Sequence, residues 1–294
     1  MYLIYGIITN FVFLISPLII FIRLIKGKED PERFKEKFCV YSEKNNLKTI
    51  WFHAASVGEL MSIVPILKEY DNNKKIKKII LTTSTTSSAK IFKKLKFKKI
   101  THKFFPIDTN FLSNKFINFW QPKVAIFVES EIWPTMISEL KERKIKIVLI
   151  NARMSEKSFK KWLSIKSFGK NILEKFDYIF PQNKETFLYF KKLGIKKIKF
   201  LGNLKFIDTH NDKFKKINNK IFNNKTILCS ASTHFNEEEI FANLHIKYKK
   251  KIPNLITIII PRHVERTNEI AHMLEKKNLK FVKHSEKRKS VNNS

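Results

Sequence analysis

The amino-acid sequence predicts an α/β protein with two parallel-sheet units behind a single apolar helix. From Leu47 onward, short runs of β-branched residues alternate with amphipathic stretches, which is typical of βαβ units on a parallel sheet. A second series of the same kind begins near Ile198 and stops before the end of the chain. The stretch from Leu3 to Ile25 is almost wholly apolar. We therefore expect a membrane segment followed by two α/β units, of which the second is incomplete.

Length and composition set the first limits on function. With 294 residues, of which 43% are hydrophobic, the chain is too long for one small domain and too apolar for a disordered tail. A formal charge of +32 would ordinarily indicate nucleic acid, anionic lipid or a phosphorylated substrate as partner. Only seven of the 58 basic residues are Arg, on which nucleic-acid readers usually depend, so a general drift toward Lys explains most of the charge. We expect no nucleic-acid partner, although an anionic membrane surface would still attract the chain.

The two cysteines, Cys39 and Cys229, lie far apart and outside any Cys/His cluster. Neither a disulfide framework nor a zinc site is indicated, and a reducing compartment is the default expectation.

The apolar stretch from Leu3 to Ile25 predicts a single transmembrane anchor, because it is long enough to cross a hydrocarbon core of ~30 Å. Arg23, Lys26 and Lys28 follow the apolar run, whereas a cleavable signal peptide carries its basic residues before it. The positive-inside rule then places the remainder of the chain in the cytoplasm. The alternative is a helix that is buried or lies in the plane of the membrane interface, which the modest length and Pro17 also allow.

The elements of the first series pair a strand with a helix. In order they are TIWFHAA with ELMSIVPILKEY, IILTTS with SAKIFKKL, VAIFVES with PTMISELKER, and the strand IKIVLINA. The second series comprises the strands IKFLGN, TILCSAS, LITIIIP and LKFVKH, with helices near 236–250 and 265–276. This organisation predicts an anchor at 1–28, Rossmann-like units at 29–197 and 198–284, and a disordered tail at 285–294. Two such units facing each other across a cleft are the layout of a nucleotide-sugar transferase.

The segment WFHAASVGEL passes from a strand into a helix through Ser56, Gly58 and Glu59. Ser56 and Glu59 have the spacing of an S-x-x-E capping box, which explains both residues structurally. Chemically, Gly58 would let a substrate approach the backbone, and a carboxylate at the carboxyl edge of a parallel sheet is where a general base belongs. The segment by itself leaves both interpretations open.

The segment VESEIWP places Glu129 and Glu131 two residues apart at the end of another predicted strand. If the strand persists, both side chains leave the same face. They would then either offset the positive end of the helix that begins near Pro134 or raise one another's pKa for proton transfer or hydroxyl binding.

The segment NARMSEKSFKKW carries Arg153, one of few Arg residues in a chain dominated by Lys. A guanidinium can pair bidentately with a carboxylate or phosphate, and the basic and aromatic residues after it would suit an anionic lipid interface. The alternative is a solvated loop with one structural Arg.

Two segments of the second series indicate a phosphate or nucleotide site. SASTHFNEEE places Ser232, Thr233 and His234 between a strand and a helix, where free amide N–H groups bind anions. PRHVER follows the next strand with Arg262 and His263. The structural alternative is that Thr233 or Asn236 merely caps the helix.

In this order, the segments HAASVGE, LTTSTT, VESEIWP, NARMS, LGNLK, ASTH and IIIPRHVER resemble the Kdo transferases of lipopolysaccharide synthesis. The resemblance covers nearly everything from Trp51 to Arg266. It implies a GT-B fold and an N-terminal hydrophobic anchor in the cell inner membrane. It also implies an inverting transfer of 3-deoxy-octulosonic acid (Kdo) from CMP-Kdo to a tetraacyl lipid A precursor, lipid IVA. The donor and the lipid A precursor are therefore the expected partners, together with the anionic inner membrane.

The resemblance also implies a role for each candidate residue. Glu59 would be the catalytic general base. The acceptor would be bound by Ser56, Gly58, Glu129, Glu131 and Arg153, and the donor by Ser232, Thr233, His234, Arg262 and His263. The sequence has no D-x-D triplet, so we expect a metal-independent reaction without a cofactor.

The chain departs from the family pattern at two places. Phe235 and Asn236 stand where the family commonly has Gly after the STH turn. The family also continues with further strands and a Gly-rich, Glu-containing segment, so the resemblance implies a C-terminally truncated chain with a half-built donor unit. The alternative function is an inactive remnant that binds lipid A precursor or anionic membrane without catalysis. A basic RNA-associated protein is a weaker alternative.

Overall fold

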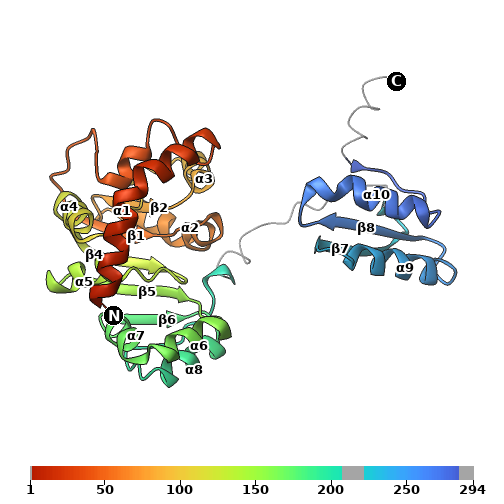
Figure 1. Cartoon of the computed structure of the whole chain (residues 1–294). Helices are drawn as coiled ribbons and strands as arrows, with labels where there is room; N and C mark the ends of the chain where they lie inside the picture. Colours follow the sequence, from red (N-terminus) through yellow and green to blue (C-terminus); the bar gives the residue numbers. More distant parts are fainter. Residues whose placement is uncertain (1, 207–221, 285–294) are drawn as a thin grey trace. The chain divides into compact units, whose positions relative to one another are not determined.

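The computed structural model describes residues 2–206 and 222–284. The chain divides into two compact units, 1–212 and 213–294, and each is considered separately below (Figure 1). The domain boundaries expected from the sequence remain predictions, and the expected tail at 285–294 lies outside the described residues.

The first unit is built on a six-stranded parallel sheet with the order β3-β2-β1-β4-β5-β6 (Figure 1). The strands are β1 (Thr49–His53), β2 (Ile79–Thr83), β3 (Ile100–Phe104), β4 (Pro122–Val128), β5 (Lys146–Ala152) and β6 (Tyr178–Pro181). This is the doubly wound order, in which the direction of winding reverses between β1 and β4. The four strands expected for this unit are confirmed, whereas the short β3 and β6 were not foreseen.

Helices cover both faces of this sheet. They are α2 (Val57–Asn72), α3 (Thr86–Leu95), α4 (Asn110–Trp120), α5 (Pro134–Glu142), α6 (Glu156–Ser164), α7 (Lys166–Leu173) and α8 (Lys184–Lys192), with a short 3₁₀ helix η1 (Phe34–Phe38). Along β1, Trp51 packs into the cluster formed with α4, α5 and α7, and Phe52 packs into the cluster formed with α2 and α3. Both faces of the central strands are therefore buried, as a parallel sheet requires.

Several helices of this unit begin at a side chain that caps the backbone. Ser56, Thr85, Thr109, Ser155 and Asn183 each accept a hydrogen bond from the N–H three residues later. These polar residues satisfy an N–H group that has no partner within its helix, so their positions in the sequence decide where the helices start.

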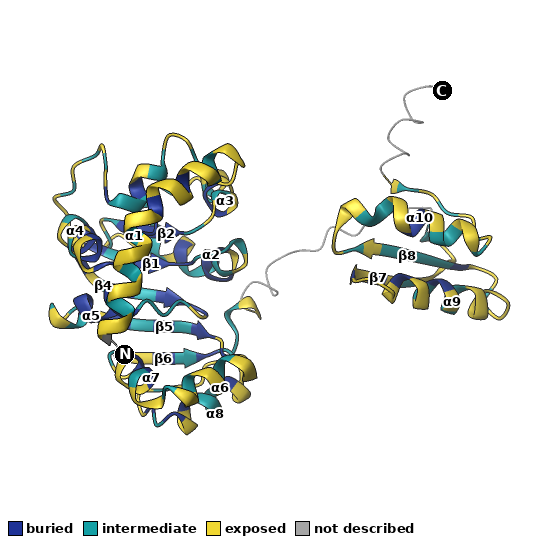
Figure 2. Ribbon diagram, viewed as in Figure 1, coloured by how far each residue is buried: buried dark blue, intermediate teal, exposed yellow. Residues whose placement is uncertain are grey.

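Helix α1 (Tyr2–Ile25) precedes the sheet. Among the described residues, Leu3–Ile25 is the one helical stretch long and apolar enough to cross a membrane, with a mean hydropathy of 2.2. Its side chains are largely exposed, as the yellow ribbon in Figure 2 shows.

The second unit contains a parallel pair of strands, β7 (Thr226–Thr233) and β8 (Leu255–Pro261). Its helices are α9 (Glu237–Lys249), α10 (Thr267–Lys276) and the 3₁₀ helix η4 (Val264–Arg266). In the described part of this unit the strand LKFVKH does not form. The predicted strand IKFLGN is also wrong, because Ile198 makes only an isolated bridge with Ile179 of β6 in the first unit. A strand needs a neighbour along its length, and neither segment has one among the described residues.

Replacing Leu67 with Ala should lower the free energy of unfolding by about 2–5 kcal/mol, because a fully buried Leu loses its apolar contacts and leaves a cavity. The exposed neighbour in the same helix provides the control, since Lys68→Ala should change the free energy by less than about 0.5 kcal/mol. Urea unfolding can be followed by the fluorescence of the buried Trp51 and Trp120. Equal effects of the two substitutions would contradict the packing of this face of α2.

Candidate functional site

Three carboxylates meet where the winding of the first sheet reverses. Glu59 lies in the first turn of α2, directly after β1, while Glu129 and Glu131 directly follow β4. Because β1 and β4 are parallel neighbours, their carboxyl ends share one edge of the sheet. The charges of Glu131 and Glu129 both act on Glu59 across this edge. The structure thus brings together the carboxylates that the sequence placed on separate segments.

The capping box at Glu59 forms with one change from the usual pattern. Ser56 Oγ accepts the Glu59 N–H at 3.3 Å and donates to Glu59 Oε1 at 3.1 Å. The second carboxylate oxygen, Oε2, accepts the N–H of Ala55 at 2.7 Å, one residue before the cap. The capping interpretation of Ser56 and Glu59 is therefore confirmed, and Glu59 also lies among the other carboxylates.

Burial raises the pKa of Glu59 above its ordinary value. The negative charge of Glu131 raises it further, and so, more weakly, does that of Glu129, while the hydrogen bonds from Ala55 and Ser56 oppose the shift. A carboxylate with a raised pKa is a stronger base, which suits a group that removes a proton from a hydroxyl.

The Glu131 side chain is held by two donors that the sequence did not assign to the site. His53 Nε2 lies 3.0 Å from Glu131 Oε2, and Trp133 donates its indole N–H to the same oxygen at 2.8 Å. On its other side, the His53 ring lies 3.0 Å from Thr82 Oγ1 through Nδ1. His53 is completely buried at the end of β1. A His at the carboxyl end of a central strand, within HAASVGE, was the signal that could have identified it.

Burial by itself would raise the pKa of Glu131, but the hydrogen bond and charge of His53, helped by the Trp133 N–H, outweigh it and lower the pKa. The expectation that Glu129 and Glu131 raise one another's pKa is therefore wrong for Glu131. The raised pKa belongs instead to Glu59, whose side chain is bonded among the described residues by the Ala55 N–H and the Ser56 hydroxyl.

Glu129 does not continue the strand, because β4 ends at Val128 and Glu129 has a left-handed φ of 58°. The prediction that Glu129 and Glu131 leave the same face of a continuing strand is therefore wrong. Lys205 lies 2.8 Å from Glu129 Oε1, and Asn151 Nδ2 donates to the same oxygen at 3.4 Å. Lys205 is the last residue of LGNLK, so this segment also reaches the carboxyl edge of the sheet.

Asn151 lies near the carboxyl end of β5, and Arg153 directly follows the strand. Asn151 is buried with φ 51°, and its Oδ1 accepts the Leu204 N–H at 3.1 Å. Arg153 donates its backbone N–H to the Glu129 carbonyl oxygen at 3.2 Å, which positions it beside the carboxylates. Its guanidinium is exposed and makes no hydrogen bond or ion pair within the described ranges. Arg153 is therefore available to an anionic ligand.

Gly58 lies exposed in the first turn of α2. A Cβ at this position would come no closer than 3.9 Å to another atom, Ser56 Oγ, and its backbone does not have a positive φ. The fold therefore does not require glycine at this position. Its absent side chain leaves the backbone beside Ser56 and Glu59 open to approach.

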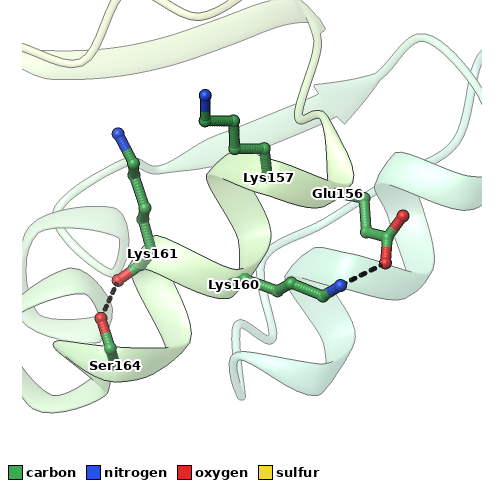
Figure 3. A pocket seen from close by; sticks show the side chains of 5 residues that line it. All are labelled: Glu156, Lys157, Lys160, Lys161 and Ser164. Atoms are coloured by element: carbon green, nitrogen blue, oxygen red, sulfur yellow. Dashed lines mark hydrogen bonds and ion pairs between the residues drawn. The ribbon is translucent and has the colours of Figure 1, made fainter.

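The lysines of α6 lie along a shallow hollow of about 490 Å³, lined by Glu156, Lys157, Lys160, Lys161 and Ser164 (Figure 3). Lys160 pairs with Glu156 at 2.7 Å, while Lys157 and Lys161 extend away from that pair (Figure 3). The aromatic neighbours face the protein instead, since Phe159 stacks on Tyr189 with ring centroids 4.5 Å apart. The hollow lies on one helix and contains none of the three carboxylates. It adds a basic surface rather than a catalytic pocket.

In the second unit, the residues expected to bind the donor lie at the carboxyl ends of β7 and β8. Ser232 has a left-handed φ of 59°, and the Arg262 N–H donates to the Thr233 carbonyl oxygen at 3.0 Å, which joins the two segments. Ser232, His234, Arg262 and His263 are exposed, and their side chains make no hydrogen bond or ion pair within 222–284. Thr233 differs, because it is buried and donates to Glu238 Oε1 at 2.7 Å.

Two acidic residues in the first turn of α9, Glu237 and Glu238, accept hydrogen bonds from the turn that precedes the helix. The His234 N–H donates to Glu237 Oε2 at 2.8 Å, so this amide is not free for a phosphate as expected. Asn236 makes no capping hydrogen bond through its side chain, which contradicts its predicted capping role. The buried Glu238 is paired with Arg266, whose Nη1 lies 2.9 Å from Oε1. Arg266 is therefore a structural residue, and Arg262 and His263 remain the exposed candidates for contact with the donor.

No group of three or more His, Cys, Asp or Glu residues is arranged to hold a metal ion in the part of the chain that the structure describes.

Comparison with known proteins identifies the family. The sequence model of the family described as "3-Deoxy-D-manno-octulosonic-acid transferase (kdotransferase)" matches residues 32–208, a range that contains all three carboxylates and Lys205. The chain belongs to this Kdo transferase family. It is 37% identical over 266 residues to the 3-deoxy-D-manno-octulosonic acid transferase of Rickettsia bellii, covering 88% of this chain and 63% of that protein. The corresponding enzyme of Haemophilus influenzae is 31% identical over 288 residues, covering 94% of this chain and 67% of that protein.

Solved structures show the same fold with little sequence similarity. The UDP-GlcNAc 2-epimerase of Neisseria meningitidis, bound to UDP-GlcNAc, matches 78% of this chain and 70% of its own with a TM-score of 0.57 and 12% identity. A glycosyltransferase of Rickettsia africae matches 80% of this chain and 66% of its own with a TM-score of 0.53 and 13% identity. These neighbours and the parallel α/β units confirm the predicted GT-B fold class for this Kdo transferase family member.

Replacing Glu131 with Gln should lower the pKa of Glu59, because removal of a neighbouring negative charge favours the ionised carboxylate. Gln keeps an oxygen in place for His53 or Trp133. The matched control is Glu142→Gln, which removes an exposed carboxylate at the end of α5. Carbon-13 NMR titration of the Glu side-chain carboxyls gives the pKa directly. A Glu59 pKa that stays unchanged or rises in Glu131→Gln would contradict the electrostatic coupling.

Proposed function

We propose that this protein is an inverting glycosyltransferase that moves Kdo from CMP-Kdo to a lipid A precursor, lipid IVA. The observation that carries the proposal is Glu59, a carboxylate with a raised pKa at the switch point of the first sheet. Membership of the Kdo transferase family supports Kdo as the sugar that is transferred. The donor nucleotide and the acceptor lipid are part of the proposal.

In the proposed reaction, Glu59 accepts the proton of an acceptor hydroxyl as that oxygen bonds to the anomeric carbon of Kdo. On the opposite face of the anomeric carbon, the bond to the phosphate oxygen breaks and CMP leaves with the electron pair. Because attack and departure occur on opposite faces, the configuration inverts. Ser56, Gly58, Glu129, Glu131 and Arg153 are assigned to the acceptor. Because His53 and Trp133 hold Glu131 and lower its pKa, Glu131 stays ionised and suits hydroxyl binding rather than proton removal.

On the donor side, we assign Ser232, Thr233, His234, Arg262 and His263 to CMP-Kdo. The exposed cationic Arg262 and the neighbouring His263 would offset the negative charge that develops on the departing phosphate. The role of Thr233 is to hold the turn through Glu238. No metal or cofactor is invoked in this reaction.

The anionic inner membrane is the proposed location, because the acceptor is a lipid and α1 carries a long apolar face. The single-pass topology and cytoplasmic orientation remain sequence-based predictions.

A second candidate function is a protein that binds lipid A precursor without catalysis. It would need only the acceptor residues of the first unit, where the exposed guanidinium of Arg153 suits the anionic groups of such a lipid. The two candidates differ in one measurable property, the transfer of Kdo to bound acceptor.

Replacing Glu59 with Gln should reduce Kdo transfer by roughly 10²–10⁴-fold, the usual contribution of a general base. Glu69→Gln, which changes an exposed carboxylate of the same helix, should leave transfer unchanged. Because the pKa of Glu59 is raised, wild-type activity should also decline on the acidic side at a higher pH than an ordinary Glu would give. The measurement is transfer of labelled Kdo from enzymatically generated CMP-Kdo to lipid IVA, made for Glu59→Gln, for Glu69→Gln and for the wild type as a function of pH. Full activity in Glu59→Gln would exclude Glu59 as the base, whereas a folded wild type that binds acceptor without transfer would establish the second candidate.

Replacing Arg262 with Ala should weaken CMP-Kdo binding without changing stability, because the Arg262 guanidinium is exposed and has no partner within 222–284. Arg266→Ala should do the opposite, costing about 1–3 kcal/mol of stability because the buried Glu238 loses its ion pair. KM for CMP-Kdo and thermal unfolding of each variant separate the two roles. An increase in KM for Arg266→Ala alone would reverse the assignment.

A further inference from the structure

The imidazole of His53, the last residue of β1, is enclosed by aromatic rings. Phe105 lies nearest, with ring centroids 4.0 Å apart, while Phe127 and Trp133 approach at 5.9 and 6.4 Å. No part of His53 is exposed. A ring packed in this way cannot exchange the positions of its two nitrogens without displacing its neighbours. Each nitrogen therefore keeps its own partners.

The Nδ1 atom of His53 faces two oxygens of Thr82 in the neighbouring strand β2. It lies 3.2 Å from the Thr82 carbonyl oxygen and 3.0 Å from Oγ1. A carbonyl oxygen can only accept a hydrogen bond, and the hydroxyl oxygen already accepts the Trp51 indole N–H at 2.9 Å. A proton on Nδ1 satisfies both contacts. Nδ1 is accordingly the donor toward Thr82.

The Nε2 atom of His53 faces Oε2 of Glu131 at 3.0 Å, and the same oxygen accepts the Trp133 indole N–H. Water has little access to this contact, because the Glu131 side chain is 15% exposed and that of His53 is fully buried. With Nδ1 already protonated, a hydrogen bond here needs a second proton between Nε2 and Oε2. The lowered pKa of Glu131 places this proton on the nitrogen, so an imidazolium faces a carboxylate.

Both donors bind Oε2 of Glu131, and the other carboxylate oxygen is left for a ligand. Among the residues that the structure describes, Oε1 of Glu131 accepts no hydrogen bond. An ionised carboxylate oxygen binds an O–H donor strongly, and a sugar hydroxyl is such a donor. The charge of Glu131 acts on Glu59, so a hydroxyl bound at Oε1 lies beside the proposed base.

We propose that His53 is a positioning residue for the acceptor: with Nδ1 locked by Thr82, its Nε2 holds Oε2 of Glu131, so that Oε1 alone is presented to an acceptor hydroxyl. His53 acts through Glu131 and does not itself touch the substrate, because its side chain is completely buried. The inference deepens the proposed function and rests on it.

A double-mutant cycle between His53 and Glu131 in the full chain tests the inference. His53→Phe keeps an aromatic ring in place but removes both nitrogens. It should lower kcat/KM for lipid IVA by roughly 10- to 100-fold, the range for one hydrogen bond to a charged group, and leave KM for CMP-Kdo unchanged. In the Glu131→Gln background the same substitution should cause no further loss, because its route to the acceptor is already broken.

His102 provides a matched control on the neighbouring part of the sheet. It is a buried His in β3 whose Nε2 lies 2.9 Å from Thr83 Oγ1, and its hydrogen bonds go to Thr83 and Arg33 instead of the carboxylates. His102→Phe should lower thermal stability without changing kcat/KM for lipid IVA. His53→Gln, whose amide N–H can still reach Oε2 of Glu131, should recover part of the loss seen in His53→Phe.

The protonation of the ring is measured separately from catalysis, by nitrogen-15 NMR of the histidine side chains, with His53→Gln to assign the signals. We expect protons on both His53 nitrogens in the wild type at neutral pH. Glu131→Gln should give a neutral ring, because the carboxylate that stabilises the second proton is gone. A wild-type ring with an unprotonated Nε2 would overturn the inference.

The outcomes separate this inference from the proposed function. Additive losses in the double variant, or an equal loss in His102→Phe, would overturn the role of His53 while wild-type transfer of Kdo upholds the function. A wild type that binds lipid IVA but transfers no Kdo would contradict the function, and the cycle is then measured as the Kd for lipid IVA. If lipid IVA neither binds nor accepts Kdo, the acceptor role of His53 fails together with the proposed function.

Discussion

Strands β1 and β4 lie side by side in register, with Ile50 opposite Val124 and His53 opposite Phe127, and the candidate site depends on this pairing. The order of winding reverses between these strands, so no crossover helix covers the gap at their carboxyl ends. Glu59 lies in the helix that follows β1, and Glu131 lies in the segment that follows β4. The same buried sheet that stabilises the unit therefore assembles the carboxylates, and a change in strand order would separate them.

The three carboxylates remain close because each has different partners. Glu131 is held by His53 and Trp133, and Glu129 by Lys205 and Asn151. Among the residues that the structure describes, the Glu59 side chain is bonded only by the Ala55 N–H and the Ser56 hydroxyl. Its pKa therefore rises with burial and with the charge of its neighbours, while that of Glu131 falls. When neighbouring titratable groups are driven in opposite directions, their acid–base roles separate. This asymmetry is the reason that we propose Glu59 as the proton acceptor and assign the other two carboxylates to binding.

The segment between β4 and α5 connects the site to the helix that we place at the membrane. It carries Glu131 and Trp133, and its next residues donate their N–H groups to Asp108, which in turn accepts the Tyr5 hydroxyl. A short continuous stretch of chain therefore carries part of the candidate site and is linked through Asp108 to α1.

The sequence by itself determined the features that depend on short spacings: the Ser56–Glu59 capping box, the helix after Pro134, four strands of the first sheet, and the apolar run of α1. It did not reveal His53 as the partner of Glu131, 78 residues away, or Tyr5 as the partner of Asp108, 103 residues away. Capping and amphipathicity are set by neighbours within one or two turns, so they can be predicted from residue order. The distant contacts, and with them the direction of each pKa shift and the docking of α1, exist only once the sheet order and helix packing have placed those residues together.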